Sequence, residues 1–182
     1  MLVDILLADG FEETEAVVPC DLLRRAGAKV RLIGVNGIRI VSSHQITVTA
    51  DAVLEAHTGD LPDLLVLPGG RRGVDNLLAS EAALDLVRRA WASGKYVAAI
   101  CAAPTILAHL GVTDGRSAVC YPGMEPRMGN AELKHLPVVT DGRLITGRAA
   151  GSSMAFGLAL VEALFGPDAA QRVADGVVYT RA

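Results

Sequence analysis

The sequence is poor in aromatic residues and lacks a marked excess of charge of either sign. Phe, Trp and Tyr make up 4% of the 182 residues, so the core must be built from aliphatic side chains. The net charge is −3, and Arg71 and Arg72 form only a pair, which we expect in a solvated loop. The absence of a basic stripe argues against binding to nucleic acid.

A basic leader and a long apolar run are also missing. The first residues, MLVDILLADG, contain no basic region, and Asp4 interrupts their apolar run, which argues against a signal peptide. The longest weakly polar stretch, residues 97–108, contains Pro104 and is too short to span a bilayer. We therefore expect a cytoplasmic protein with no membrane partner.

Cysteine is scarce as well, with Cys20, Cys101 and Cys120 as its only occurrences. An odd number of widely spaced cysteines argues against a disulfide framework. Neither a CxxC nor an HxxxH pattern occurs, so we expect no dedicated metal site. The phosphate-binding pattern GxxxxGK[ST] is absent too, which argues against phosphate-ester chemistry.

What the sequence does contain is an alternation of short apolar runs with segments of helical period. The runs predict buried strands, and the intervening segments predict helices, the typical pattern of an α/β protein with a mostly parallel central sheet. We expect one domain over residues 1–182. The predicted strands are 3–8, 29–34, 64–67 and 96–100, the predicted helices are 12–26, 80–93, 103–110 and 152–165, and the predicted hairpins are 38–41 with 46–49 and 138–140 with 144–146.

In an open α/β sheet, ligands bind beyond the carboxyl ends of the strands. Cys101 stands at such an end, between the apolar run YVAAI and the helical segment APTILAHL. Its small neighbours permit a sharp, strained turn that lifts the side chain above the sheet, and the helix N-terminus favours thiolate. We predict a backbone outlier and a pKa below the ordinary thiol value of about 8.5. The alternative is a small buried hydrophobe in an Ala-rich strand end.

Two further elements lie at the same expected edge. Glycines in Pro68-Gly69-Gly70 would let backbone N–H groups approach a ligand, although a purely structural turn explains them equally well. Glu15 follows the first strand, and helical spacing places it beside Val18 rather than on a long polar face. A carboxyl in such a place tends to keep its proton, which would let it act as an acid or base beside the thiolate.

The segments ADGFEETEAVVPCDLLRRAG, LLVLPGG, AAICAAPTILA and GRAAGSSMAFGLALVEAL together resemble the ThiJ/PfpI superfamily. Within it they are most similar to the branch of the parkinsonism-associated deglycase and its bacterial relatives. The resemblance runs in order through nearly the whole chain. It implies a flavodoxin-like doubly wound sandwich, a homodimer, a nucleophile at Cys101 and a protonated glutamate at Glu15.

The resemblance also implies further site residues. The family's backbone donors fall on Gly70 and Ala102, beside Gly69. Other positions that line the family pocket fall near Arg25 and Ser152 or Ser153. His44 lies in the hairpin that reaches toward the partner in family dimers, although an exposed turn residue is an equally good interpretation.

At one position the sequence departs from the family pattern. Tyr121 stands where some members carry a histidine close to the cysteine, and a phenol with a pKa near 10 is a poor base at neutral pH. The protease branch carries a histidine directly after the cysteine, where this chain has Ala102. Without a base beside the sulfur an amide is a hard target, which argues against a peptidase.

Two functions fit these residues. The first is a cofactor-free glyoxalase or deglycase that acts on methylglyoxal, glyoxal or their early adducts through a Cys101 hemithioacetal, with Glu15 as the proton shuttle. The second is a non-enzymatic sensor of oxidative stress or a chaperone-like protein, in which an accessible thiolate oxidises selectively to sulfinic acid. Because both functions use the same residues, the sequence does not separate them.

Overall fold

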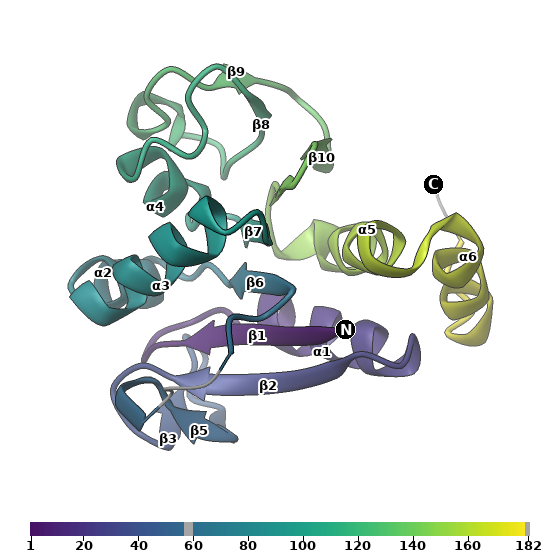
Figure 1. Ribbon diagram of the computed structural model, residues 1–182, viewed down its shortest axis with the longest axis horizontal. Helices are drawn as coiled ribbons and strands as arrows, with labels where there is room; N and C mark the ends of the chain where they lie inside the picture. The colour runs from purple at the N-terminus through teal and green to yellow at the C-terminus, as the bar shows by residue number, and fades with distance from the viewer. Residues whose placement is uncertain (57–59, 181–182) are drawn as a thin grey trace.

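A computed structural model describes residues 1–56 and 60–180, and its centre is a seven-stranded sheet (Figure 1). The strand order is β10-β11-β7-β6-β1-β2-β5, and every neighbouring pair is parallel except β10 with β11. The strands are β1 (Leu2–Leu7), β2 (Lys29–Gly34), β5 (Ala52–Val53), β6 (Leu64–Leu67), β7 (Tyr96–Ile100), β10 (Val138–Asp141) and β11 (Leu144–Gly147). The predicted α/β class and mostly parallel sheet are confirmed.

Helices cover both faces of this sheet, which makes the fold a doubly wound sandwich. One hydrophobic cluster joins the sheet to α1 (Glu13–Arg25), α5 (Ser153–Phe165) and α6 (Pro167–Gly176). The other cluster joins it to α2 (Arg71–Leu78), α3 (Glu81–Ala92) and α4 (Pro104–His109). Figure 1 shows α5 and α6 together on one side and α2, α3 and α4 gathered on the other. Burial on both faces explains why the central strands are continuously apolar.

Asp4 is the polar exception within the buried strand β1. Its carboxylate is fully buried and receives two hydrogen bonds from Arg31, its register partner on β2, at 2.7 and 2.9 Å. A bidentate guanidinium is the geometry that best compensates a carboxylate removed from water.

Several elements were not predicted. Helix α2 begins at Arg71, where a solvated loop was expected. It was not predicted because its first residues are two arginines and a glycine rather than an apolar repeat. The predicted helix 152–165 ends as α5 at Gly166, which has a φ of 84°, and Pro167 then starts α6, a helix that was not predicted. The remaining short elements are the predicted hairpin β3 (Arg39–Val41) with β4 (Thr47–Thr49), the unpredicted pair β8 (Ser117–Ala118) with β9 (Glu132–Leu133), and the 3₁₀ turns Leu54–Ala56, Glu125–Arg127 and Ala150–Ser152.

None of the helices in residues 1–56 and 60–180 is both long enough and apolar enough to cross a membrane.

The Asp4–Arg31 pair predicts a large stability cost for Arg31→Ala. The substitution removes two charge-assisted hydrogen bonds from a fully buried carboxylate, which we expect to lower the free energy of unfolding by about 3 kcal/mol. Arg89→Ala is the matched control, because Arg89 also donates Nε at 2.7 Å to an aspartate, Asp85, but in a half-exposed pair. We expect about 0.5 kcal/mol there. Urea unfolding measures both, and equal losses would contradict the prediction.

Candidate active site

Cys101 occupies the sharp turn between β7 and α4. Its φ is +66°, in the left-handed region that non-glycine residues rarely adopt, so the predicted backbone outlier is confirmed. Both of its backbone groups are held, because its N–H donates to the Gly147 carbonyl at 2.9 Å and its carbonyl accepts from the Tyr121 N–H at 2.7 Å. Hydrogen bonds from neighbouring segments therefore maintain the strained turn, and the half-buried side chain stands at the carboxyl end of β7.

Glu15 reaches the same place from the first turn of α1. The residue is fully buried, and its Oε2 accepts a hydrogen bond from the Gly69 N–H at 2.9 Å. Its Oε1 has no hydrogen-bond partner within the described part of the chain. A side chain on Gly69 would place its Cβ 2.6 Å from both Glu15 Oε2 and Cys101 Cβ. The carboxyl and the cysteine therefore meet beside a glycine that leaves no room for a side chain.

The Cys101 sulfur also receives two backbone donors. The N–H groups of Gly70 and Ala102 both form hydrogen bonds to it and lower its pKa. Gly70 adopts a φ of +85°, and a Cβ at this position would collide with the Gly10 carbonyl. The structure thus brings the predicted residues Glu15, Gly69, Gly70 and Ala102 together around Cys101.

Burial and mutual charge decide how this pair holds its protons. Burial raises the pKa of Glu15 to about 7, although hydrogen bonds with Cys101 and Gly69 oppose the shift. Burial, then the charge of Glu15, raises the pKa of Cys101 to about 12. The prediction of a thiol pKa below the ordinary value is therefore wrong, because burial and then the adjacent Glu15 carboxylate outweigh the two backbone donors.

A thiol and a carboxyl in such contact titrate as a pair rather than independently. Below pH 7 the pair holds both protons and is neutral. Above that pH it carries one negative charge and one shared proton. When that proton lies on Glu15, the sulfur is a thiolate and the carboxyl is a hydrogen-bond donor beside it.

A cleft of about 380 Å³ opens over the sulfur. Tyr121, which the sequence singled out, lines it and is about half exposed. Arg71 lines the same cleft, although we predicted it only as a residue of a solvated loop. The signal that could have revealed Arg71 was its place directly after the Pro68-Gly69-Gly70 turn. The full lining consists of Arg71, Cys101, Ala102, Tyr121, Pro122, Gly123 and Met124.

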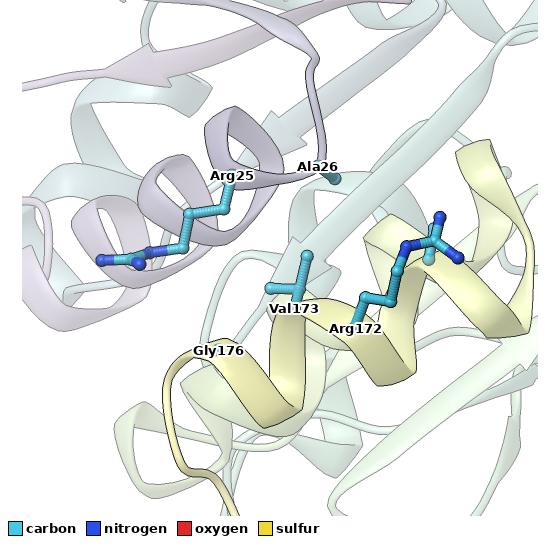
Figure 2. A pocket seen from close by; sticks show the side chains of 6 residues that line it. Arg25, Ala26, Arg172, Val173 and Gly176 are labelled. Carbon is cyan, nitrogen blue, oxygen red and sulfur yellow. The ribbon is translucent and has the colours of Figure 1, made fainter.

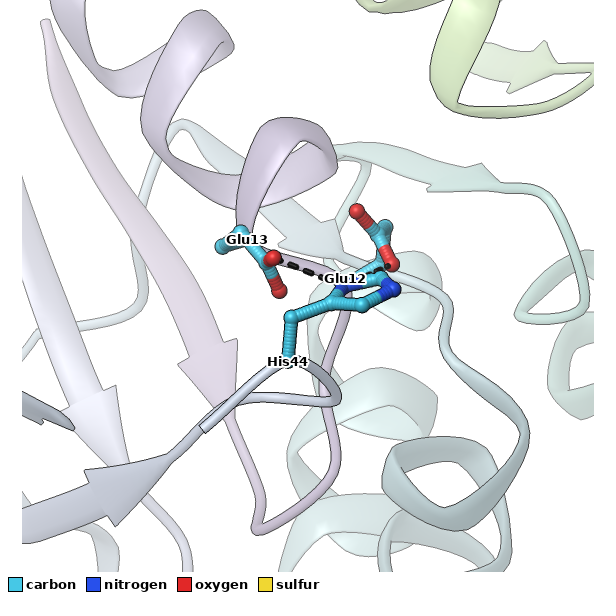
Figure 3. Close-up of side chains that lie close together, drawn as sticks. All are labelled: Glu12, Glu13 and His44. Atoms are coloured by element: carbon cyan, nitrogen blue, oxygen red, sulfur yellow. Dashed lines mark hydrogen bonds and ion pairs between the residues drawn. The ribbon is translucent and has the colours of Figure 1, made fainter. Parts of the chain in front are cut away.

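His44 lies outside this lining, on the turn between β3 and β4 (Figure 3). Its Nδ1 is 2.7 Å from Glu13 Oε1 and 3.6 Å from Glu12 Oε2, so the exposed ring fastens the hairpin to the start of α1. These three residues could each offer one ligand atom to a metal ion, since the atoms lie within 4.8 Å of one another. In the structure the three groups instead satisfy one another.

Within one chain, Arg25 and Ser152 do not line the cysteine cleft. Arg25 is the last residue of α1, ten residues beyond Glu15, which is about 15 Å along a helix axis. It borders a separate hollow with Arg172 and Val173 (Figure 2). The Ser152 hydroxyl donates to the Ala149 carbonyl at 2.7 Å, and the residue lines a groove beside Tyr179. Ser153, the alternative, is buried, and its Oγ has no partner among the described residues.

Comparison with known proteins points to one family. The family model described as the DJ-1/PfpI family matches residues 1–163. The Drosophila melanogaster protein dj-1beta is 40% identical over 177 residues, which cover 96% of this chain and 95% of that protein. A deglycase of Pyrococcus abyssi is 35% identical over 158 residues, which cover 86% of this chain and 95% of that protein.

The fold agrees with solved structures at similar levels of identity. The crystal structure of Drosophila melanogaster DJ-1beta has a TM-score of 0.95 and 38% identity, and the match covers 99% of this chain and 98% of that one. A DJ-1 superfamily protein from Salmonella typhimurium has a TM-score of 0.94 and 36% identity, with 99% of both chains covered.

The site predicts that Cys101 is the first of the three thiols to be alkylated. Cys20 and Cys120 are buried, whereas Cys101 is only half-buried and lines the cleft. Because the Cys101–Glu15 pair loses its first proton near pH 7, its alkylation rate should rise with pH through that value. Iodoacetamide labelling between pH 5 and 9, quantified by peptide mass spectrometry, measures this. If Cys20 or Cys120 were labelled first at pH 6, or if the alkylation rate of Cys101 rose only above pH 10, the coupled titration of Cys101 and Glu15 would be contradicted.

Proposed function

Because the chain belongs to the DJ-1/PfpI family, we propose that it is a cofactor-independent glyoxalase or deglycase. It acts in the cytoplasm, as a single domain, on methylglyoxal, glyoxal or their early adducts. The observation that carries the proposal is the buried Glu15 carboxyl, which meets Cys101 beside Gly69 while two backbone N–H groups bind the sulfur. A nucleophile, a proton carrier and fixed donors are the groups that such an isomerisation requires.

The first step is addition to the aldehyde. The thiolate forms a C–S bond to the aldehyde carbon, the electron pair of the C=O π bond moves to oxygen, and that oxygen takes the proton from Glu15. The product is a hemithioacetal beside an ionised Glu15. Raising the pKa of this carboxyl to about 7 is what allows it to hold the proton beforehand at neutral pH.

The second step moves a proton between adjacent carbons. Ionised Glu15 removes the proton from the former aldehyde carbon, and the electron pair forms a C=C bond while the neighbouring carbonyl becomes an enediolate oxygen. Glu15 then returns that proton to the neighbouring carbon, and the hydroxyl proton of the former aldehyde carbon moves to the enediolate oxygen, which gives a thioester of a 2-hydroxy acid. Water then hydrolyses the thioester to lactate from methylglyoxal or glycolate from glyoxal. One carbon is oxidised and its neighbour is reduced, so the reaction consumes only water and needs no external oxidant.

The same geometry supports no peptidase activity. Ala102 follows the nucleophile, and no histidine is among the described residues that line the cleft. The one acid beside the sulfur, Glu15, gives its proton to the oxygen of the attacked carbonyl, so no second acid stands ready to protonate a leaving amine. Addition to an aldehyde expels no amine, so it does not need this proton donor.

The alternative function, a sensor of oxidative stress, rests on the same contacts. A sulfinate formed at Cys101 would be held by the Gly70 and Ala102 N–H groups and by the proton of Glu15. Lactate formation from methylglyoxal without added thiol separates the two functions, because a sensor needs no turnover.

We also propose that the protein assembles as a homodimer through the outer face of α1. Val17 is half exposed there, and with Val18 and Met154 it borders a broad hollow beside Val177. These apolar residues lie at the outer face of α1 and are not needed to cover the sheet, so they are available to a partner.

The mechanism predicts different fates for three substitutions. Glu15→Gln keeps a hydrogen-bond donor but carries no transferable proton, so we expect kcat for methylglyoxal to fall by about 10²–10⁴ while Cys101 remains alkylatable. Glu15→Asp withdraws the carboxyl by one methylene and should cost about a hundredfold. Cys101→Ser should abolish turnover without loss of the fold. The measurement is lactate formation at equal folded concentration, checked by circular dichroism.

Glu13→Gln is the matched control for these variants. It makes the same chemical change two residues away, on a carboxylate that faces His44 rather than the sulfur, so turnover should stay within about threefold of the starting protein. Activity retained in Cys101→Ser eliminates the covalent mechanism. Activity retained in Glu15→Gln eliminates the proton shuttle and leaves the thiolate chemistry standing.

For assembly, we expect Val17→Glu to convert a dimeric mass into a monomeric one. The added charge would have to be buried in the interface, which costs several kcal/mol. Leu136→Glu changes a similarly exposed apolar residue outside this face and should leave the mass unchanged. Light scattering at micromolar concentration measures both variants. A monomeric mass for the unaltered protein would refute the dimer.

A further inference from the structure

Arg71 occupies a distinctive position beside the nucleophile. It is the first residue of α2 and directly follows Gly70, whose N–H binds the Cys101 sulfur. Its side chain lines the same cleft as Cys101, together with Tyr121 and Met124. The backbone hydrogen bond at Gly70 therefore fixes the origin of the arginine side chain relative to the sulfur.

The Arg71 guanidinium is exposed and forms no ion pair or hydrogen bond with another residue of the described chain. Its neighbour Arg72 is different, because the Arg72 stem lies against Gly10, where a Cβ would come within 2.6 Å of it. Two other exposed arginines face an acidic partner, Arg25 facing Asp21 and Arg89 facing Asp85. Arg71 is a cation presented to the cleft.

The charge balance of the cleft gives this cation a role. The Cys101–Glu15 pair carries one negative charge once its first proton has left. Glu125, which borders a neighbouring hollow, accepts a hydrogen bond from the N–H of Gly123, a residue of the cleft lining. These charges repel an anionic reactant. A guanidinium at the mouth offsets that repulsion and can bind a carboxylate through two parallel N–H groups.

We propose that Arg71 is a specificity-determining residue that gives Cys101 a preference for small reactive carbonyl compounds bearing a carboxylate. A 2-oxoaldehyde such as 4,5-dioxopentanoate fits this description, with the aldehyde carbon on the sulfur and the carboxylate on Arg71. Turnover of such a compound rests on the proposed function. It follows the same reaction as methylglyoxal, in which the 2-oxoaldehyde and one water give a 2-hydroxy acid. The anion preference of the sulfur itself does not depend on turnover.

The test compares two alkylating reagents of nearly equal size. Iodoacetate is an anion and iodoacetamide is neutral, and each forms one C–S bond to Cys101 as iodide leaves. We expect Arg71→Gln to lower the iodoacetate-to-iodoacetamide rate ratio about tenfold, with the iodoacetamide rate within twofold of the starting protein. The difference between the variants should shrink in 0.5 M NaCl, because salt screens an exposed ion pair.

Arg72→Gln is the control, since it removes the adjacent charge while keeping the Cβ and Cγ that contact Gly10. Its rate ratio should stay within twofold of the starting protein. An unchanged ratio in Arg71→Gln, an equal fall in Arg72→Gln, or an equal slowing of both reagents in Arg71→Gln would overturn the proposal.

Turnover then separates this proposal from the function on which its substrate class rests. We expect Arg71→Gln to lower kcat/KM for 4,5-dioxopentanoate about tenfold and to leave methylglyoxal nearly unchanged. If neither compound is turned over but the alkylation ratio responds to Arg71, the proposed enzyme activity fails and the anion preference stands. If methylglyoxal is turned over, and Arg71→Gln changes neither the alkylation rate ratio nor the ratio of kcat/KM for the two substrates, the activity stands and the anion preference is wrong.

Discussion

The contact between Glu15 and Cys101 beside Gly69 is the constraint on which the rest of the site depends. An ionised carboxylate that is fully buried costs several kcal/mol unless it is paired, and Glu15 has one hydrogen bond from protein backbone on Oε2 and none on Oε1 among the described residues. Holding a proton near neutral pH is the least costly state for such a group. Because a Cβ on Gly69 would displace both side chains, the loop that closes over them must carry glycine.

The topology of the sheet makes this contact possible. β7, β6 and β1 are neighbours in the sheet and run parallel, so their carboxyl ends lie at one edge. Cys101 follows β7, Gly69 and Gly70 follow β6, and Glu15 lies in the first turn of the helix that follows β1. Three segments distant in sequence thus converge without any long loop, which is why ligand sites in open α/β sheets form at this edge.

Much of this arrangement could be predicted from the sequence, because its causes are local. The central strands are recognisable because burial on both faces requires continuous apolar residues. The elbow at Cys101 is recognisable because only small neighbours fit a sharp turn. Helix α2 was missed because two arginines and a glycine open it, and Arg71 was missed with it. Arg25 was placed near the pocket by the family resemblance alone, and along α1 it lies ten residues, about 15 Å, beyond Glu15.

The thiol pKa was mispredicted for a reason that bears on the chemistry. From the sequence we expected Glu15 beside the sulfur but judged the thiol pKa from the helix N-terminus alone, whereas burial and the Glu15 charge raise that pKa in the structure. A lone thiolate of low pKa would be a ready nucleophile but would have no proton to give to the oxygen of the aldehyde. A coupled pair supplies both from one charge state, since transfer of a single proton from sulfur to carboxyl creates the nucleophile and its acid together. Burial, which raises both pKa values, is therefore compatible with reactivity at neutral pH.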